Sequence, residues 1–382
     1  MKKILIVAMA DSVHTARWLR QFDSDEIEFV LFPSTPHRRI HGLIGEHKKV
    51  KRPSSLRISR FMTVGALPLG VLDLLFDNFF RSKLLAREIK TFQPDIIHIM
   101  ETQHSGYLAN KALKKSRTSS KIILSIWGSD LFWFQRFKQH RIKISSVLKM
   151  VDLLVMECNR DREIALGLGF DGAFAVNMPA TGGLNTGLLR ERALEQPTVT
   201  RKLIAVKGYS GFVGLGTDAL RIIELVEAEI NEFSVIVYSA GLRTMWQSRG
   251  LRKSMGERLQ VIRKHKLSNF EIEEMFLKSR VSLGLSLSDG LPATVKEAMC
   301  AGAIPIQTST SCAGEWFADG IGGHLVNEAD IKSAAEALLT VLRDDSFAHA
   351  ASESNYQIAE NRFSETKVRE QSQSLYFSLS NS

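Results

Sequence analysis

Two acidic residues, Asp289 and Glu297, stand eight positions apart in the stretch SDGLPATVKEAMCAG at residues 288–302. Pro292 suits the first position of a helix and Gly302 suits its exit, so the pattern predicts a short helix after the apolar run VSLGLSL. On a helical wheel the apolar side chains share one face, and Glu297 points nearly the opposite way. We therefore do not expect Glu297 in the core.

The position of these acids favours a nucleotide diphosphate as ligand. Open α/β sheets bind ligands beyond the carboxyl ends of their strands, which is where this loop and helix are predicted to lie. A carboxylate such as Glu297 can accept both hydroxyls of a ribose, and the N–H groups near Ala293 and Thr294 can bind a phosphate. A lone glutamate would ordinarily be a solvated surface group, but the strand, loop and helix around this one favour a ligand.

A glycine-rich loop occurs at residues 206–220, VKGYSGFVGLGTDAL, between a predicted strand and a predicted helix. Gly214, Gly216 and Ala219 fit the GxGxxA pattern of a dinucleotide site, which would indicate an NAD-dependent oxidoreductase. Several residues separate this triplet from the strand, and the later run SVIVYSAG lacks the acid that would hold an adenosine ribose. The oxidoreductase is therefore the weaker hypothesis.

Further candidates follow predicted strands of the N-terminal half. VAMADSVHTARWLRQF contains His14, and SIWGSDLFWF contains Trp127, Gly128 and Asp130. Asp130 fits a substrate contact and a helix cap equally well. A lone histidine such as His14 or His104 near a strand end is more often a structural hydrogen-bonding group than a ligand.

The elements that must position these residues form an α/β pattern. Short apolar runs alternate with helical segments through residue 156, which predicts a parallel sheet with crossover helices. These runs are KKILIVAM, EFVLF, DIIHIM, KIILSIW and DLLVM. The rhythm restarts after residue 202 with KLIAVKG, SVIVYSA, VSLGLSL and AIPIQTS, so we predict a second α/β unit. A chain of 382 residues is also too long for one hydrophobic core.

Domain boundaries follow from the same rhythm. We predict an N-terminal Rossmann-like domain at 1–176 and a C-terminal one at 203–360. Residues 177–202, rich in Gly, Pro and Thr, are the predicted linker. Residues 361–382 are predicted as a C-terminal helix that docks on a surface, with the N-terminal domain as one candidate.

Charge favours anionic partners, because the net charge is +9 and the pI is near 9.4. Residues 38–60 hold eight Lys or Arg and one acid, and an apolar segment follows with Leu72, Leu75, Phe76 and Phe79 in register. This pattern suits an anionic bilayer surface, and it suits a solvated loop before a core helix at least as well. A non-catalytic binder of anionic surfaces is a third hypothesis. The basic stretch has no nucleic-acid motif, so we expect no nucleic-acid partner.

Cysteine use favours a reducing compartment, because three cysteines occur without CxxC or metal spacing. We therefore predict a cytoplasmic protein, with a peripheral position on the inner face of the membrane as an alternative. In the opening MKKILIVAMA only seven apolar residues precede Asp11, which favours a first buried strand over a signal peptide. The apolar stretch 61–80 carries Asp73 and Asp77 and is broken by Pro68, so we do not expect it to span a membrane.

Together these residues resemble the retaining glycosyltransferases of the GT-B fold, specifically glycosyltransferase family four (glycosyl transferases group 1). That family's signature is two acids with seven residues between them, followed by EAMA-G and an apolar strand. Here the corresponding parts are Asp289 to Glu297, EAMCAG and AIPIQTS. Glu315 in CAGEWFADG and the following GGHLV are similar to the family's closing segment. The resemblance covers nearly the whole chain and implies two Rossmann-like domains whose parallel sheets face a cleft.

The resemblance implies the residues of the donor site in the C-terminal domain. Glu297 would bind the donor ribose, and Asp289, a shorter acid than the family's usual Glu, would act at the donor sugar. The remaining donor-binding residues implied by the resemblance are Gly208, Gly290, Leu291, Pro292, Ala293 and Thr294.

The resemblance also implies two cations that neutralise the departing diphosphate. Lys207 matches the first, although a solvated lysine at a strand end is a serious alternative. Phe212 stands where the second is expected, so Arg243 and Lys296 are stand-in candidates.

For the acceptor side, the resemblance implies the N-terminal loops. WGSDL is similar to the family's HGSDL, with Trp127 in place of a histidine that often contacts the donor sugar. Asp130 is the matching catalytic candidate. The implied acceptor-binding residues are His14, His104, Trp127 and Gly128.

The implied reaction is hexosyl transfer, with retention, from a nucleoside diphosphate sugar to a hydroxyl of a glycan or lipid-linked acceptor. A role in bacterial surface polysaccharide or glycoconjugate synthesis would follow. The sequence has no DxD flanked by a strand end and no His/Asp cluster with ligand spacing, so we expect no metal and no other cofactor.

Overall fold

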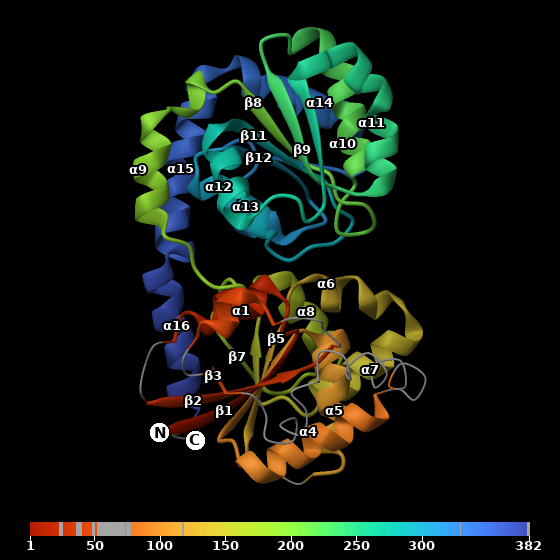
Figure 1. The fold of residues 1–382 in the computed structure, drawn as a ribbon, viewed down its shortest axis with the longest axis vertical. Coiled ribbons are helices and arrows are strands. Elements are labelled where there is room, and N and C mark those ends of the chain that lie inside the picture. The colour runs from red at the N-terminus through yellow and green to blue at the C-terminus, as the bar shows by residue number, and fades with distance from the viewer. Residues whose placement is uncertain are drawn as a thin grey trace. The chain divides into compact units, whose positions relative to one another are not determined.

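Parallel strands alternate with helices along two stretches of the chain, which form separate units. The structure is a computed structural model, and it describes residues 1–22, 26–35, 40–47, 50–51, 73, 78–116, 118–328 and 330–379. Unit 1 comprises Met1–Gly183 and Thr366–Ser382, and unit 2 comprises Leu184–Glu365. Figure 1 shows the sheet and the surrounding helices of each unit.

Unit 1 contains a seven-stranded parallel sheet in the order β3-β2-β1-β4-β5-β6-β7. The strands are β1 (Lys2–Ala8), β2 (Ile27–Pro33), β3 (Val50–Lys51), β4 (Ile96–Met100), β5 (Lys121–Ser125), β6 (Leu153–Val155) and β7 (Ala173–Phe174). The helical segments that belong with this sheet are α1 (Val13–Leu19), α2 (Gly42–Gly45), α4 (Phe79–Phe92), η2 (Thr102–Gly106), α5 (Tyr107–Leu113), α6 (Ser129–Phe132), η3 (Phe134–Arg136), α7 (Lys138–Leu148), α8 (Asn159–Gly167) and α16 (Glu365–Ser378).

Alternation of side chains along the strands builds a core on each face of this sheet. Leu5 and Val7 of β1 pack in one cluster with residues of α4, α5 and α7. Ile4 and Ile6 point the other way and pack with residues of α1 and α16. Helices cover both faces, so the strands read as almost continuous apolar runs in the sequence.

Unit 2 contains a six-stranded parallel sheet in the order β10-β9-β8-β11-β12-β13. The strands are β8 (Leu203–Lys207), β9 (Ser234–Ala240), β10 (Leu259–Arg263), β11 (Ser279–Gly284), β12 (Ile304–Thr308) and β13 (His324–Val326). The helical segments are α9 (Thr186–Glu195), η4 (Thr198–Thr200), α10 (Gly216–Val226), η5 (Glu227–Glu229), α11 (Leu242–Met255), η6 (Gly256–Arg258), α12 (Asn269–Lys278), α13 (Ala293–Cys300), η7 (Cys312–Glu315), α14 (Ile331–Arg343) and α15 (Asp345–Phe363).

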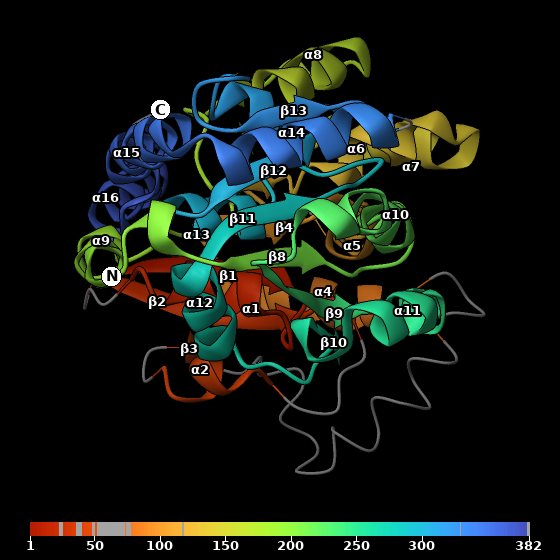
Figure 2. The same cartoon turned by 90° about the horizontal axis from the view of Figure 1, so that it is seen from above.

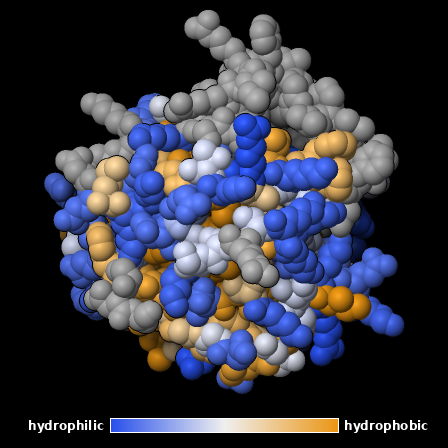
Figure 3. Space-filling view, turned by 90° about the horizontal axis from the view of Figure 1, so that it is seen from below, coloured by the Kyte–Doolittle hydropathy of each residue, from blue (hydrophilic) through white to orange (hydrophobic). Residues whose placement is uncertain are grey.

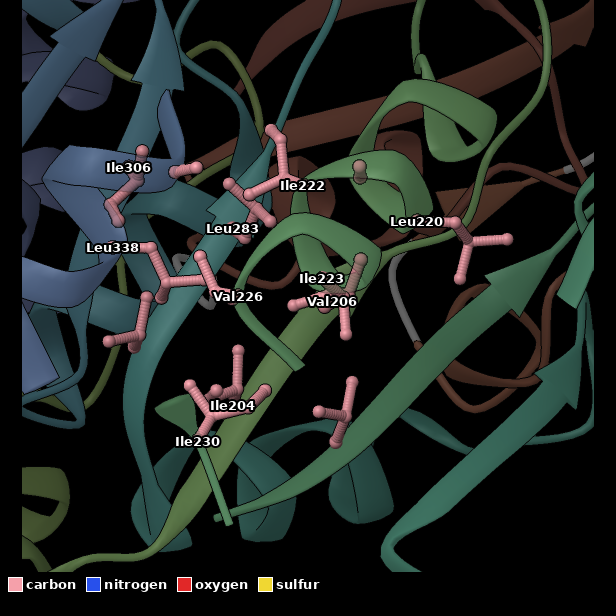
Figure 4. Packing of buried hydrophobic residues seen from close by; sticks show 14 of the residues in the cluster. Ile204, Val206, Leu220, Ile222, Ile223, Val226, Ile230, Leu283, Ile306 and Leu338 are labelled. Carbon is pink, nitrogen blue, oxygen red and sulfur yellow. The ribbon is translucent and has the colours of Figure 1, made fainter. Parts of the chain in front are cut away.

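The same alternation places helices on both faces of the second sheet, as Figure 2 shows from above. Ile204 and Val206 of β8 pack against α10, α11 and α14, and Figure 4 shows them beside Leu220, Ile223 and other aliphatic side chains of this cluster. Ala205, between them, faces the opposite cluster, which includes residues of α9, α12, α13 and α15. Both units are therefore doubly wound Rossmann-like domains, and the predicted fold class is confirmed in this respect.

Every apolar run that we named as a strand forms one, but the sequence prediction missed β3, β7, β10 and β13. Three of these have only two or three residues, and β10 (LQVIR) breaks its apolar run with Gln260. One unit boundary, after Gly183, falls inside the predicted 177–202 linker, and the other, after Glu365, lies five residues beyond the predicted boundary at 360. Within the predicted linker, residues 186–195 form α9, which belongs to unit 2.

No helix of the described residues is long and apolar enough to cross a membrane. On the face drawn in Figure 3, hydrophilic and hydrophobic residues of the described chain are interspersed. Most of the basic stretch 38–60, including Lys48, Lys49 and Arg52, and the apolar residues Leu72, Leu75 and Phe76 lie outside the described residues. The predicted bilayer contact therefore stays a prediction.

The C-terminal helix α16 is held to unit 1 by a buried polar chain. Trp18 Nε1 donates a hydrogen bond of 2.9 Å to Tyr376 Oη, and Tyr376 Oη lies 2.7 Å from His98 Nδ1. His98 Nε2 lies 2.7 Å from Ser125 Oγ. Burial lowers the pKa of His98 to about 3, so the ring stays neutral near pH 7.

We expect Tyr376→Phe to destabilise unit 1 by about 1 to 3 kcal/mol, because it leaves the buried Trp18 N–H and His98 without their shared partner. Tyr356→Phe in α15 is a matched control, since this half-exposed ring has no hydrogen bond through its hydroxyl among those in the described structure. Urea unfolding followed by hydrogen exchange in peptides from β1 and β4 measures the stability of unit 1 separately from that of unit 2. Equal stability of the two variants would show that the polar chain does not anchor α16.

Candidate functional site

The order of strands in unit 2 reverses between β8 and β11, which pair side by side. The helix after β8, α10, packs on one face of the sheet, and the helix after β11, α13, packs on the other. The two connecting loops therefore separate at the carboxyl edge. Such a switch point is where open α/β sheets bind ligands.

Backbone hydrogen bonds hold these two loops together. Leu215 N–H donates to the Leu285 carbonyl at 2.8 Å. Leu287 N–H and Ser288 N–H donate to the Phe212 carbonyl at 2.8 Å and 3.1 Å. Phe212, where a second cation was expected, thus contributes a backbone acceptor that fixes the loop preceding Asp289.

An ion pair joins the two loops across the switch point. Lys207, the last residue of β8, places its Nζ 3.3 Å from Asp289 Oδ2. The Lys207 side chain is only 5% exposed and that of Asp289 is 21% exposed, so water competes little for the ammonium group. Asp289 Oδ1 accepts the Gly290 N–H at 3.0 Å. The two predicted catalytic residues of this unit are therefore brought together, and the solvated-lysine alternative for Lys207 is wrong.

The glycines of the β8 loop have a packing role. A Cβ on Gly216 would lie 2.7 Å from the Gly208 carbonyl carbon, and one on Gly214 would lie 2.3 Å from Tyr209 Cβ. Gly208 itself has no room for a Cβ, because Val237 Cγ1 would be 2.8 Å away. The GxGxxA spacing is thus explained by close approach of the loop to its own strand and helix.

The predicted donor-binding loop leads directly into α13. The Gly290 carbonyl accepts the Cys312 N–H at 3.0 Å, and Leu291 is 5% exposed. Pro292 precedes the first helical residue, Ala293, instead of occupying that position as the sequence suggested. The first N–H groups of a helix lack intrahelical partners, so those of Ala293 and Thr294 can receive an anion.

Glu297 is half-buried on α13, whereas Val295, Ala298 and Met299 of the same helix are in the core. Its charge acts on the nearby phenol of Tyr238. Burial raises the pKa of Tyr238, a hydrogen bond with Thr294 lowers it, and the charges of Tyr209 and Glu297 raise it further. The expectation that Glu297 lies outside the core is confirmed. Lys296, a candidate second cation, is instead 1% exposed.

In unit 1 the strand order reverses between β1 and β4. The helix that follows β1, α1, carries His14 in its first turn, and the His14 N–H donates to the Ser12 side chain that caps the helix. The His14 ring lies 5.2 Å, centroid to centroid, from the ring of Trp127, which follows β5, the strand next to β4. Two predicted acceptor-binding residues are therefore in contact. Gly128, the next residue, has φ 82°, a backbone conformation that favours glycine.

Asp130 joins the loop after β5 to the loop after β4. Its Oδ1 accepts the Trp127 N–H at 2.9 Å, and its Oδ2 accepts the Thr102 N–H at 3.2 Å and the Thr102 hydroxyl at 3.1 Å. Burial, with the charges of Glu101 and Asp161, raises its pKa well above the usual range. These contacts indicate a positioning role instead of the proposed helix cap, and direct contact with a substrate stays a prediction.

Comparison with known proteins agrees with this geometry. Residues 3–158 match a family model described as glycosyl transferase 4-like, and residues 247–358 match one described as glycosyl transferases group 1. Solved structures that are similar to this chain include glycosyltransferases of the GT-B fold. The chain is a GT-B glycosyltransferase.

The similar structures are distant in sequence. Anabaena Alr3699/HepE in complex with UDP and glucose is 14% identical, with a TM-score of 0.70 over 100% of both chains. Sucrose-phosphate synthase from Thermosynechococcus elongatus is 13% identical, with a TM-score of 0.75 over 100% of both chains. The lipopolysaccharide outer core galactosyltransferase WaaB in its apo form is 16% identical, with a TM-score of 0.66 over 99% of both chains. No curated protein sequence matches this chain significantly.

One residue of this glycosyltransferase that the sequence analysis missed is Glu101, directly after β4. It has φ 70°, which a residue with a side chain adopts at a cost. Its carboxylate accepts the N–H groups of Gln103, His104 and Ser105 at 2.9, 2.7 and 2.6 Å. The available signal was an acid directly after an apolar strand and three residues before a histidine.

Glu101 also orients the predicted acceptor-binding residue His104. Glu101 Oε2 lies 3.4 Å from His104 Nδ1, and the His104 side chain is 58% exposed. In the neutral ring, the tautomer with its proton on Nδ1 donates to this carboxylate and has Nε2 as a hydrogen-bond acceptor. The hydrogen bond to Glu101 raises the pKa of His104, burial partly opposes this, and the charge of Glu101 adds to it.

We expect the His104 ring to titrate above the usual value of about 6.5, and Glu101→Gln to bring it back toward that value. The raised pKa means that protonation of His104 favours the folded state, and this contribution is lost as pH rises through the folded-state pKa. Ring resonances in NMR, assigned with His104→Gln, measure the shift. His140 is the internal control, because burial and Lys143 lower its pKa without Glu101. A His104 pKa unaffected by Glu101→Gln would contradict the assigned contact.

Proposed function

We propose that this glycosyltransferase transfers a hexosyl group from a nucleoside diphosphate sugar to a hydroxyl of a glycan or lipid-linked acceptor, with retention of anomeric configuration. The observation that carries the proposal is the Lys207–Asp289 ion pair at the switch point of unit 2, in the loop that leads to Glu297. The complex of Anabaena Alr3699/HepE with UDP-glucose supports a nucleotide-sugar donor by likeness of fold.

Stabilisation of the leaving group is the main catalytic contribution in this proposal. Negative charge grows on the diphosphate as the bond from the anomeric carbon to the phosphate oxygen breaks. The buried ammonium of Lys207 and the first N–H groups of α13 are fixed before reaction, so they need little reorganisation. A well-placed donor of this kind lowers the barrier by about 3 kcal/mol. Asp289 both orients Lys207 and can accept a hydroxyl of the donor sugar.

Retention is proposed to follow from attack on the face that the leaving group occupies. A double displacement would need a carboxylate nucleophile about 5 Å from an acid partner. The donor residues proposed here supply Asp289, which is engaged by Lys207, and Glu297, which is assigned to the ribose. The acceptor hydroxyl instead forms the new bond to the anomeric carbon and passes its proton to the departing phosphate oxygen.

The acceptor is assigned to unit 1. The contacting rings of His14 and Trp127 offer an apolar surface for a sugar ring, and His104 offers Nε2 to a hydroxyl. Gly128 places backbone close to this surface. The basic stretch 38–60 supports work at the cytoplasmic face of a membrane on a lipid-linked acceptor, in bacterial surface polysaccharide or glycoconjugate synthesis.

We further propose that donor binding needs no metal, because the sequence offers cations and helix N–H groups for the diphosphate and no DxD motif.

The first test is calorimetric binding of UDP, GDP and ADP in EDTA. We expect one of them to bind the wild type. Glu297→Gln should weaken the binding of that nucleotide by about tenfold or more, because a charged hydrogen-bond acceptor is lost. We also expect the wild type to prefer it to its 2′-deoxy analogue, and the variant to lose this preference.

Glu336→Gln on α14 is the matched control, because Glu336 is exposed and α14 packs on the other face of the sheet. If none of the three nucleotides binds the wild type, the proposed function is wrong. If binding appears only when Mg²⁺ or Mn²⁺ replaces EDTA, the assignment of the diphosphate to side chains and backbone is wrong.

A further inference from the structure

Two ammonium groups lie beside one aromatic ring at the carboxyl edge of the unit 2 sheet. Lys207 Nζ is 5.1 Å from the centroid of the Tyr209 ring, and Lys264 Nζ is 5.4 Å from the same centroid. Both distances are within the range at which a ring attracts a cation. Lys264 was not among the residues that the sequence indicated.

The fold brings Lys264 to this edge. It directly follows β10, and its N–H donates to the Ala240 carbonyl at the end of β9 at 3.1 Å. The β8 loop reaches across β9 from the other side, because Gly241 N–H donates to the Gly208 carbonyl at 3.0 Å. Tyr209 therefore extends from β8 past β9 to the residue after β10.

Tyr209 is held firmly in this loop. Gly214 packs so closely on it that a Cβ would lie 2.3 Å from Tyr209 Cβ, and the Tyr209 carbonyl accepts the Gly216 N–H at 2.9 Å. The half-buried ring is thus a fixed surface against which the flexible Lys264 side chain packs.

The charges here are unbalanced. Lys207 is paired with Asp289, but among the described residues no carboxylate forms an ion pair with Lys264. Arg263 and Lys266 add positive charge to the same loop, while Glu271 is engaged by the Ser268 N–H and hydroxyl. Positive charge that no carboxylate offsets attracts an anion such as a phosphate group.

Resting on the proposed function, we infer that Lys264 supplies the second cation that binds the diphosphate of the donor. Lys264 approaches the diphosphate from the end of β10, whereas Lys207 approaches it from the end of β8. Of the alternatives, Lys296 is buried on α13 and Phe212 supplies only its backbone to the neighbouring loop. Arg243 lies at the exposed start of α11, and no contact in the described structure joins it to Lys207 or Tyr209.

The test compares Lys264→Gln with Lys266→Gln, which removes an equal charge two residues away. Lys266 is exposed and has no contact with Tyr209 in the described structure. Calorimetry uses the nucleoside diphosphate that binds the wild type and its parent nucleoside. We expect Lys264→Gln to weaken binding of the nucleoside diphosphate about tenfold and to reduce the salt dependence of that binding. The affinity for the parent nucleoside should change less than twofold. Lys264→Arg should restore most of the affinity, and Lys266→Gln should change it less than twofold.

The outcomes separate this inference from the function on which it rests. Failure of the wild type to bind any nucleoside diphosphate overturns the proposed function. If the wild type binds a nucleoside diphosphate and Lys264→Gln binds it with the same affinity, the inference about Lys264 is overturned and the proposed function is not. If Lys264→Gln and Lys266→Gln weaken diphosphate binding equally, the inference is also overturned, because the effect then comes from the net charge of the loop. Matched circular dichroism and melting temperatures show that the variants are folded.

Discussion

The pairing of β8 with β11 is the constraint on which the rest of the candidate site in unit 2 depends. It places the ends of two strands, remote in sequence, next to each other and sends their helices to opposite faces of the sheet. Lys207 and Asp289 can therefore meet across the gap at 3.3 Å. A nearly buried ammonium without its carboxylate would carry a large desolvation cost, and the strand pairing avoids this cost because it brings Asp289 to Lys207.

The two units use the same topology with different electrostatics. In unit 1 the carboxylates at the edge, Glu101 and Asp130, are satisfied by backbone N–H groups and the Thr102 hydroxyl, and the rings of His14 and Trp127 contact each other. In unit 2 the edge is rich in cations and glycine-lined backbone. The first environment suits neutral hydroxyls, and the second suits an anion.

The glycine pattern in the β8 loop of unit 2 has two physical explanations, a dinucleotide site and close backbone packing. Its spacing fits a dinucleotide fingerprint, but the structure explains Gly208, Gly214 and Gly216 by the approach of the loop to β9, Tyr209 and α10. The space that these glycines leave allows Tyr209 to lie where it contacts both Lys207 and Lys264.

The sequence alone determined the fold class, the main strands and the acidic pair Asp289 and Glu297. Each of these is a local property: apolar runs repeat with the period of a strand, and two acids flank a helix start within one short segment. The very short strands carried too little periodicity to be seen. The extent of each unit depends on packing, since α9, within the predicted linker, contributes Leu189 and Ala193 to the core of unit 2.

Only the tertiary structure decided which distant residues meet. The side-by-side ends of β8, β9 and β10 bring Lys264 to Tyr209, and the fold of unit 1 seats Tyr376 of α16 against His98. Strand order and the crossing of helices to one face or the other fix these contacts. The residue spacing within a single segment does not determine the strand order or the side to which a helix crosses, because both depend on the free energy of packing the whole unit.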